Sequence, residues 1–176
     1  MGASAFKGAS PEHHGPGVQY AALPYSWSDG LRILLVTSRE TGRWVLPKGW
    51  PMARKKPHAA AAREAMEEAG VTGKIGKTSI GSYHYVKRLK DAAELTCLVN
   101  VYPLEVARQL KRWPEQRQRT AQWFAPEDAA LAVHEPPLAA LITKFAASPP
   151  APRGAGKKGG KGKPGHAEAK PASKKP

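Results

Sequence analysis

The chain has a single cysteine, Cys97, among its 176 residues, which excludes a disulfide bond within the chain. It also lacks any apolar run of about 18 residues, the length that a membrane-spanning helix requires. Residues 1–17 contain no apolar core of the kind found in signal peptides, so we expect no secretory signal there. These absences favour a reducing compartment, and we expect a cytoplasmic protein with no membrane contact.

Acidic residues are scarce as well. The chain has 14 Asp and Glu against 28 Lys and Arg, a net charge of +14 at pH 7. Seven Lys and one Arg against one Glu lie between Pro149 and Pro176, in a stretch rich in proline and glycine. Such a composition predicts disorder and salt-sensitive contacts with nucleic acid or another polyanion, although a solubilising tail without a specific partner would look the same. We therefore expect a flexible N-terminus (1–17), one domain (18–147) and a disordered basic tail (148–176).

Short apolar runs between turn signals predict a chain of mixed strands and helices. The expected strands are 18–23, 31–37, 43–46, 71–75, 80–87, 95–104 and 120–124. The expected helices are 57–69, one that starts at 126, and one from 136 to about 147. One early and two late helices around mixed strands indicate an α/β sandwich.

The few acidic residues crowd into one of these helices. Glu64, Glu67 and Glu68 have the spacing i, i+3 and i+4, which places them on one helical face where like charges repel one another. A solvated acidic face is the simplest interpretation of such a cluster. A hard divalent cation with oxygen ligands would offset the repulsion, and its usual companions are phosphate oxygens.

The segment from Gly49 to Val71 resembles a Nudix box, whose pattern is G-x5-E-x7-R-E-U-x-E-E-x-G-U with U an aliphatic or similar residue. Lys55 is the one departure, because the family usually has glutamate there. The resemblance implies a Nudix-type α/β/α sandwich with a mixed central sheet, and metal-dependent hydrolysis with Mg²⁺ or Mn²⁺. The matching residues are Gly49, Arg63, Glu64, Ala65, Glu67, Glu68, Gly70 and Val71.

The same resemblance implies roles for the box residues. Glu64 and Glu68 would be direct metal ligands. Glu67 would be a further ligand, a water-mediated contact or the catalytic base, and Glu68 is the other candidate for the base. Arg63 would orient a box glutamate, although a purely structural role or a substrate contact fits it too. Gly49 would allow a close approach of the backbone.

Candidate residues for binding substrate phosphates come from the same region. The segment 41–49 and the stretch 119–129 resemble diphosphoinositol polyphosphate and diadenosine polyphosphate hydrolases, and so does 134–145. Lys55 could contact a substrate phosphate or a box carboxylate, or it could weaken the metal site. Taken singly, each of these cations is more often a solvated surface charge. The candidates are Arg39, Arg43, Lys48, Gly49, Lys55 and Arg119.

The sequence therefore predicts hydrolysis of a phosphoanhydride bond in a small anionic substrate, of the nucleoside-diphosphate-X or polyphosphate type. Diadenosine or diphosphoinositol polyphosphates are favoured because the chain is strongly basic. One alternative is an RNA 5′-pyrophosphohydrolase whose basic tail grips RNA. Another is a catalytically weakened module that binds a nucleotide or nucleic acid. The oligomeric state is left open.

Overall fold

The structure, a computed structural model, describes residues 17–89 and 93–151. Residues 1–16 of the expected flexible N-terminus (1–17) and 152–176 of the expected tail (148–176) lie outside these ranges, whereas Gly17 already belongs to a strand. The strands are β1 (Gly17–Ser26), β2 (Arg32–Thr37), β3 (Trp44–Val45), β4 (Lys48–Gly49), β5 (Val71–Ile75), β6 (Gly81–Arg88), β7 (Glu94–Gln109) and β8 (Ala121–Phe124). The helices are α1 (Pro57–Ala69), α2 (Pro126–Ala132) and α3 (Pro136–Ala147). None of the described helices is long and apolar enough to span a membrane.

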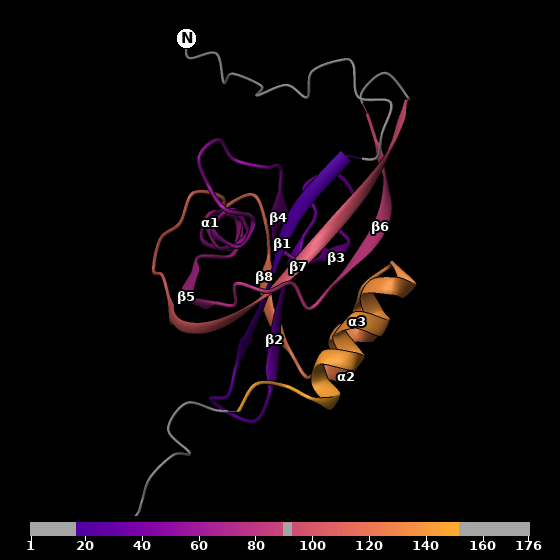
Figure 1. Cartoon of the computed structure of the whole chain (residues 1–176). Coiled ribbons are helices and arrows are strands. Elements are labelled where there is room, and N and C mark those ends of the chain that lie inside the picture. The colour runs from indigo at the N-terminus through magenta and orange to yellow at the C-terminus, as the bar shows by residue number, and fades with distance from the viewer. Residues whose placement is uncertain (1–16, 90–92, 152–176) are drawn as a thin grey trace, which may run out of the picture.

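The strands form one mixed sheet, as predicted. Its main path runs β3-β2-β1-β7-β5, while β8 also pairs with β2, β6 with β7 and β4 with β1. The β1–β7 pair is parallel, with Gly17 opposite Cys97 and Tyr25 opposite Glu105, and the other pairs between named strands are antiparallel. The two longest strands therefore lie side by side at the centre of the molecule (Figure 1).

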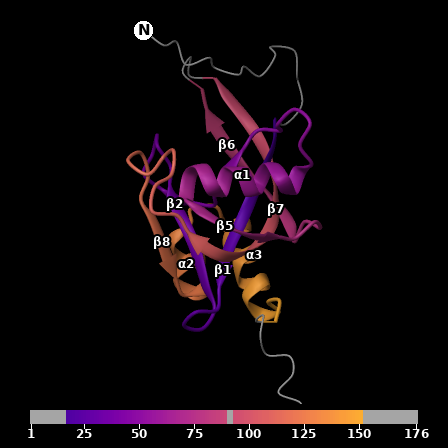
Figure 2. The ribbon, with the colours of Figure 1, turned by 90° about the vertical axis from the view of Figure 1, so that its left-hand side faces the viewer.

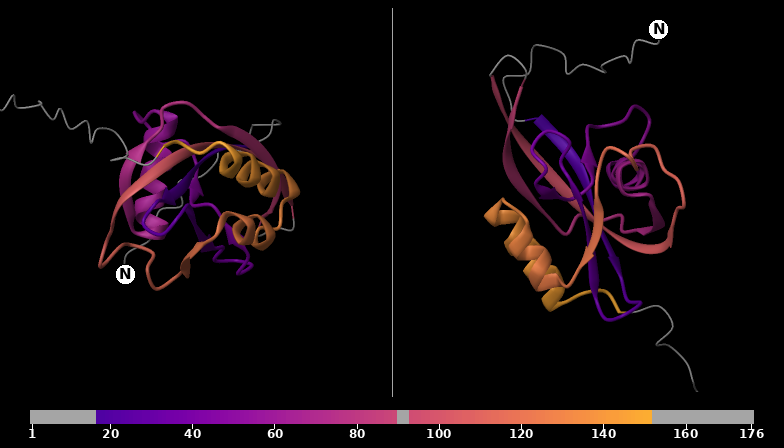
Figure 3. Two further views of the ribbon diagram at one scale, coloured as in Figure 1. Left: turned by 90° about the horizontal axis from the view of Figure 1, so that it is seen from below. Right: turned by 180° about the vertical axis from the view of Figure 1, so that it is seen from behind.

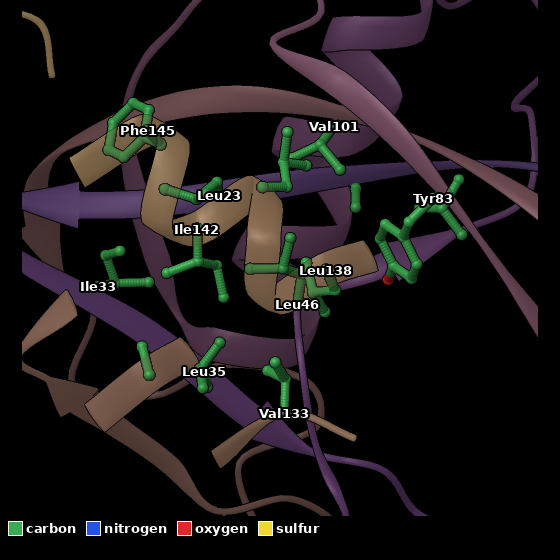
Figure 4. Packing of buried hydrophobic residues seen from close by; sticks show 14 of the residues in the cluster. Leu23, Ile33, Leu35, Leu46, Tyr83, Val101, Val133, Leu138, Ile142 and Phe145 are labelled. Carbon is green, nitrogen blue, oxygen red and sulfur yellow. The ribbon is translucent and has the colours of Figure 1, made fainter. Parts of the chain in front are cut away.

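Helices cover both faces of the sheet, which confirms the predicted α/β/α sandwich. Helix α1 packs on one face and crosses the strands (Figure 2), while α2 and α3 lie together on the other (Figure 3). The alternation of side chains along the central strands supplies both cores. In β2, Ile33 and Leu35 face the α2/α3 side, whereas Leu34 and Val36 face α1. The short helices α2 and α3 thus share a core with Leu23, Val101 and Tyr83 (Figure 4).

The box helix α1 has the predicted limits, and an alanine face explains its close packing. Ala61, Ala65 and Ala69 are fully buried against the sheet. Pro57 starts the helix at a position where a missing N–H costs little. Gly70 ends it in the left-handed conformation with φ 68°.

Three strand assignments differ from the prediction. β1 continues past the predicted end at residue 23 to Ser26, because Tyr25 and Ser26 pair with Ile33 and Arg32 of β2. β7 continues to Gln109, because β5 and β1 both extend its pairing. β4 was not predicted, since only its pairing with β1 makes this two-residue segment a strand.

Pro103 sits within the long strand β7 without breaking it. Pairing with β6 ends at Val101, and pairing with β5 begins at Leu104. Proline has no N–H to donate to a neighbouring strand. Its missing donor therefore falls where β7 changes partner, which is the place where the sheet tolerates it.

Candidate active site

The loop that leads into α1 is held against the helix by a carboxylate. In β4, Lys48 and Gly49 pair with Ala21 and Tyr20 of β1, which fixes the backbone just ahead of the box helix. The carboxylate of Glu64 lies so close to Gly49 that a Cβ added there would overlap it. The glycine is therefore needed for space, and it brings a helix carboxylate against the strand backbone.

Glu68 is the most buried of the box carboxylates, with 5% of its surface exposed. Its Oε2 accepts a hydrogen bond of 3.2 Å from the backbone N–H of Lys48. Its Oε1 accepts one of 2.5 Å from Nη2 of Arg119, whose side chain is also almost fully buried. One carboxylate thus ties α1 both to β4 and to the segment before β8.

Arg119 is in turn fixed by two other parts of the chain. Its Nη1 donates to the backbone carbonyl of Thr37 at the end of β2, at 3.0 Å. Its Nε donates to Oε2 of Glu115 at 2.6 Å. Every nitrogen of the Arg119 guanidinium therefore has a protein acceptor, which favours a role in positioning Glu68 over the predicted contact with substrate phosphate.

The loop 110–120 places Arg119 because it is fastened to the end of α1 (Figure 1). The last carbonyls of a helix have no partner within it. Here Glu115 N–H donates to the carbonyl of Glu67 at 3.0 Å, and Leu110 N–H to that of Gly70 at 2.7 Å. The indole of Trp113 lies over Gly70, where a side chain would overlap it. The loop therefore satisfies the helix end and carries Glu115 and Arg119 to the box.

Glu67 has a different partner from Glu68. Its Oε1 accepts a hydrogen bond of 2.5 Å from Nε of Arg63, one helical turn earlier, and both side chains are partly exposed. This contact has the geometry that the predicted orienting role of Arg63 requires. It also turns Glu67 toward Arg63.

Two of the box carboxylates carry charge that the protein does not fully compensate. Burial and, after it, the negative charges of Glu68, Glu67 and Glu115 raise the pKa of Glu64 to about 7, although Arg119 opposes the shift. Burial also raises the pKa of Glu68 to about 7, although Arg119 and Lys48 oppose the shift. Within the described residues, Glu64 makes no hydrogen bond or ion pair through its side chain. A cation near Glu64 would therefore relieve unfavourable charge.

The donor set suits an ion that keeps much of its water. Among the residues that the structure describes, no three His, Cys, Asp or Glu side chains converge into a metal-binding cluster. Glu67 is turned to Arg63, and Glu68 shares its oxygens with Arg119 and Lys48. Mg²⁺ is usually held by one or two carboxylates together with water and substrate phosphates, not by a complete protein cage. Glu64 and Glu68 fit that pattern from adjacent turns of α1.

Lys48 is placed by β4 at the other side of the same loop. Its Nζ lies 4.9 Å from the centre of the Tyr85 ring, at a distance typical of a cation–π contact. Burial lowers the pKa of its ammonium, while the carboxylates of Glu68 and Glu135 raise it. Lys48 is thus a half-buried cation next to Gly49, as a phosphate-binding residue would be.

The remaining predicted phosphate ligands are not gathered at the box. Nη1 of Arg39 donates to Oε1 of Gln118 at 3.1 Å and lies 3.8 Å from Glu115, so it belongs to the loop 110–120. Arg43 and Lys55 are exposed, and their side chains form no hydrogen bond or ion pair within the described part of the chain. Their contact with substrate stays a prediction.

Sequence reasoning missed Glu115, which faces Arg119 and repels Glu64 and Glu68. The only local signal was the opposite charge of Glu115 and Arg119 four residues apart, and a turn at 114–118 brings the two side chains together. No local signal marked Thr37, whose carbonyl and hydroxyl anchor Arg119 and Thr120 across more than eighty residues.

Comparison with known proteins agrees with this geometry. The NUDIX domain matches residues 20–145. A diphosphoinositol polyphosphate phosphohydrolase 3-beta from Bos taurus is 34% identical over 117 residues, which span 64% of this chain and 67% of that protein. The mitochondrial Nudix hydrolase 16 of Arabidopsis thaliana is 32% identical over 109 residues, 60% of each chain.

Solved structures show the same fold at lower identity. The crystal structure of an Ap4A hydrolase from C. elegans has a TM-score of 0.56 at 20% identity, covering 76% of this chain and 98% of its own. A Nudix hydrolase from Nitrosomonas europaea has a TM-score of 0.60 at 20% identity, with 79% and 94% covered. The chain therefore belongs to the Nudix family, and it is a hydrolase that acts on pyrophosphate bonds.

Proposed function

We propose that this hydrolase cleaves a phosphoanhydride bond in a nucleoside-diphosphate-X or polyphosphate-type substrate with the help of Mg²⁺ or Mn²⁺. Diadenosine and diphosphoinositol polyphosphates are the favoured substrates, because the chain is strongly basic and its relatives include a diphosphoinositol polyphosphate phosphohydrolase. The observation that carries the proposal is the pair Glu64 and Glu68, two carboxylates held against the loop at Lys48 and Gly49, of which Glu64 has no ion-pair partner within the described residues.

The contacts of each residue indicate its role in metal binding, positioning or phosphate binding. Glu64 and Glu68 supply oxygen ligands, and Glu68 is held for that task by Arg119 and by the N–H of Lys48. When bound, the divalent ion would neutralise phosphate charge and lower the pKa of a water molecule. Lys48 holds a phosphoryl oxygen beside the loop.

The base that accepts a proton from the attacking water was expected to be Glu67 or Glu68. Each of these already accepts a hydrogen bond from an arginine, which occupies a carboxylate oxygen that a water molecule would otherwise use. Glu64 has no such partner within the described residues and has a pKa of about 7. The geometry therefore adds Glu64 to the candidates for the base, since a base works best with a pKa near the working pH.

Two alternatives remain worth testing. An RNA 5′-pyrophosphohydrolase is favoured by the charge of the basic tail, of which the structure describes only 149–151. A weakened nucleotide-binding module is suggested by Lys55 in place of the usual glutamate. Lys55 is exposed and is not among the main charges that shift the pKa of Glu64 or Glu68, which argues against direct damage to the site. The domain limits 18–147 and the cytoplasmic location stay predictions.

The test is product release from a panel of substrates with Mg²⁺ and with Mn²⁺. The panel contains diadenosine tetraphosphate, diphosphoinositol pentakisphosphate, ADP-ribose, polyphosphate and triphosphorylated RNA. Glu68→Gln serves as the blank, and Glu94→Gln, an exposed carboxylate that pairs with the exposed Arg88, as the matched control.

We expect metal-dependent turnover that is lost in Glu68→Gln and kept in Glu94→Gln. Preferential cleavage of the RNA would favour the first alternative. Nucleotide binding without turnover of any substrate would support the binding module and overturn the proposal.

A further inference from the structure

Two lysines, Lys48 of β4 and Lys87 of β6, lie near the more buried face of β6 and next to the box loop. Alternation along this strand puts Tyr83, Tyr85 and Lys87 on the more buried face and leaves His84 exposed on the other. The partner strand β7 sets Tyr85 opposite Cys97. This face of β6 therefore continues the surface that begins at Lys48.

Lys87 lies over an aromatic ring from the box loop. Its Nζ is 5.5 Å from the centre of the Trp50 indole, and Trp50 directly follows Gly49 in the chain. The indole is itself seated on Gly17 of β1, where a Cβ would come within 2.9 Å of the ring. The Trp50 ring is thus fixed between β1 and Lys87, one residue from the glycine that contacts Glu64.

Lys48 makes the same kind of contact with a ring of β6, that of Tyr85, which lies two residues before Lys87. It lies over Tyr85, whose hydroxyl donates to Oε1 of the buried Gln19 at 2.8 Å and is thereby held in place. Residues two apart on one strand face are separated by about 7 Å. The two lysines therefore approach one surface, each against a ring that a neighbouring element fixes.

Neither lysine has an anionic partner within the described part of the chain. No ion pair or hydrogen bond joins either ammonium to a protein acceptor there. The charges of Glu68 and Glu135 act on Lys48 from the box helix and from the segment before α3, without direct contact. Two positive charges held close together on partly desolvated surface repel each other, and an anion between them would offset that repulsion.

We propose that Lys48, Lys87, Trp50 and Tyr85 form an anion subsite for a phosphoryl group that lies beyond the scissile bond of the substrate. The subsite would make the enzyme prefer substrates with three or more phosphoryl groups over those with only two. This inference rests on the proposed phosphoanhydride hydrolysis, and it assigns Lys87 and Trp50 to substrate selection.

The first test measures binding without turnover. Isothermal titration of the full chain with inorganic tripolyphosphate and with pyrophosphate, without divalent metal and at about 0.3 M salt, limits the contribution of the basic tail. The variants are Lys87→Met, Trp50→Phe and the control Lys74→Met, an exposed lysine on β5. We expect Lys87→Met to weaken tripolyphosphate binding about tenfold and pyrophosphate binding less than twofold, with the control unchanged. Equal affinities in Lys87→Met and Lys74→Met would overturn the subsite.

The second test uses turnover, with thermal unfolding to confirm that each variant folds. For Lys87→Met, we expect KM for diadenosine tetraphosphate and for diphosphoinositol pentakisphosphate to rise about tenfold with kcat unchanged, while ADP-ribose is unaffected. A larger effect on one of the two polyphosphates identifies whether a linear or a clustered phosphate occupies the subsite. An equal rise for ADP-ribose would contradict the inference. If nothing is hydrolysed and tripolyphosphate binding still depends on Lys87, the subsite stands and the proposed hydrolysis falls.

Discussion

Arg119 and Glu68 show what a single buried contact contributes to the candidate site. Both side chains are almost fully buried, and the arginine also bonds Glu115 and Thr37. Removing one member of a buried pair leaves the other charge without compensation, at a cost of about 3–5 kcal/mol. Arg119 therefore stabilises the fold and orients a box carboxylate at the same time.

Replacing Arg119 by Met should lower both stability and turnover. We expect the free energy of unfolding to fall by about 3 kcal/mol and kcat to fall about a hundredfold, with KM little changed because each nitrogen of the buried Arg119 guanidinium already has a protein acceptor. Denaturant unfolding and steady-state kinetics measure both. Arg88→Met, which removes an exposed pair with Glu94, is the control. Partial rescue of kcat by Arg119→Lys supports positioning, whereas a rise in KM with kcat intact would show that Arg119 binds substrate.

Glu64 should make the metal-free protein less stable as the pH rises. Its pKa is about 7 in the folded state against an ordinary value of 4.5, so between these pH values the folded state binds more protons than the unfolded state. Stability from this group is therefore fully present near pH 4.5, falls as the pH rises to about 7, and is level above that. In a chelator, Glu64→Gln should melt higher than wild type at pH 7.5 and show a flatter profile between pH 5 and 7.5. Identical profiles for the two proteins would refute the raised pKa.

The residues of the site were predictable only where the signal is local. Glu64, Glu67 and Glu68 share one helix, and Arg63 lies one turn from Glu67, so spacing alone brought them together. The Arg119–Glu68 pair joins residues 51 positions apart, and helical spacing carries no information at that distance. Arg119 was predicted to bind a substrate phosphate, and its three protein acceptors could not be foreseen from the sequence.

At the scale of elements, the end of α1 is fixed by Gly70 for two separate reasons. Its φ of 68° is unfavourable for other residues, and the Trp113 ring fills the space that a side chain would need. The backbone there also accepts from Leu110 N–H. The helix end and the loop 110–120 are consequently one unit.

Gly70→Ala should destabilise the protein more than the same change at Gly42. Gly42 has nearly the same φ, 67°, but open space around its Cβ position. We expect Gly42→Ala to cost about 1 kcal/mol for the backbone alone, and Gly70→Ala about 1–3 kcal/mol more because Trp113 must move. Urea unfolding of both variants isolates the packing contribution. Equal losses of unfolding free energy in the two variants would mean that the contact of Trp113 with Gly70 does not stabilise the loop 110–120.

Elements with their own sequence signal were predicted, and elements that neighbours create were not. The limits of α1 follow from Pro57 and Gly70, and those of β5 from the apolar residues at its ends. β4 has no strand preference and exists because β1 pairs with it. The predicted strand 95–104 already included Pro103, and the extension of β7 to Gln109 was missed because pairing with β5 and β1, not a local signal, makes these last residues a strand.

At the scale of the whole molecule, charge is divided between the domain and the tail. Residues 149–176 carry +7 of the +14, and only 149–151 are described by the structure. A segment of this kind adds salt-dependent affinity for polyanions and has no part in the geometry around Glu68.

Deleting residues 149–176 should leave hydrolysis of small substrates unchanged within about twofold. Binding to single-stranded RNA, measured by fluorescence anisotropy at several salt concentrations, should weaken and lose much of its salt dependence, by about 0.7 in the slope for each phosphate contact removed. An eightfold Lys-to-Gln and Arg-to-Gln exchange in the tail, at unchanged length, is the control for chain length. Slower hydrolysis of diadenosine tetraphosphate after deletion would instead place the tail in the catalytic cycle.

The parallel pairing of β1 with β7 has a consequence for biosynthesis. Gly17 of β1 lies opposite Cys97 of β7. During synthesis β1 therefore emerges from the ribosome long before β7, the strand that pairs with it at the centre of the sheet. Until then, of its three partners in the described sheet, β1 has β2 and the short β4 beside it, and its open apolar edge at residues 21–23 invites association with other nascent chains. Slow translation between these strands would prolong that exposure, whereas a chaperone that shields β1 until β7 emerges would raise the yield of folded enzyme.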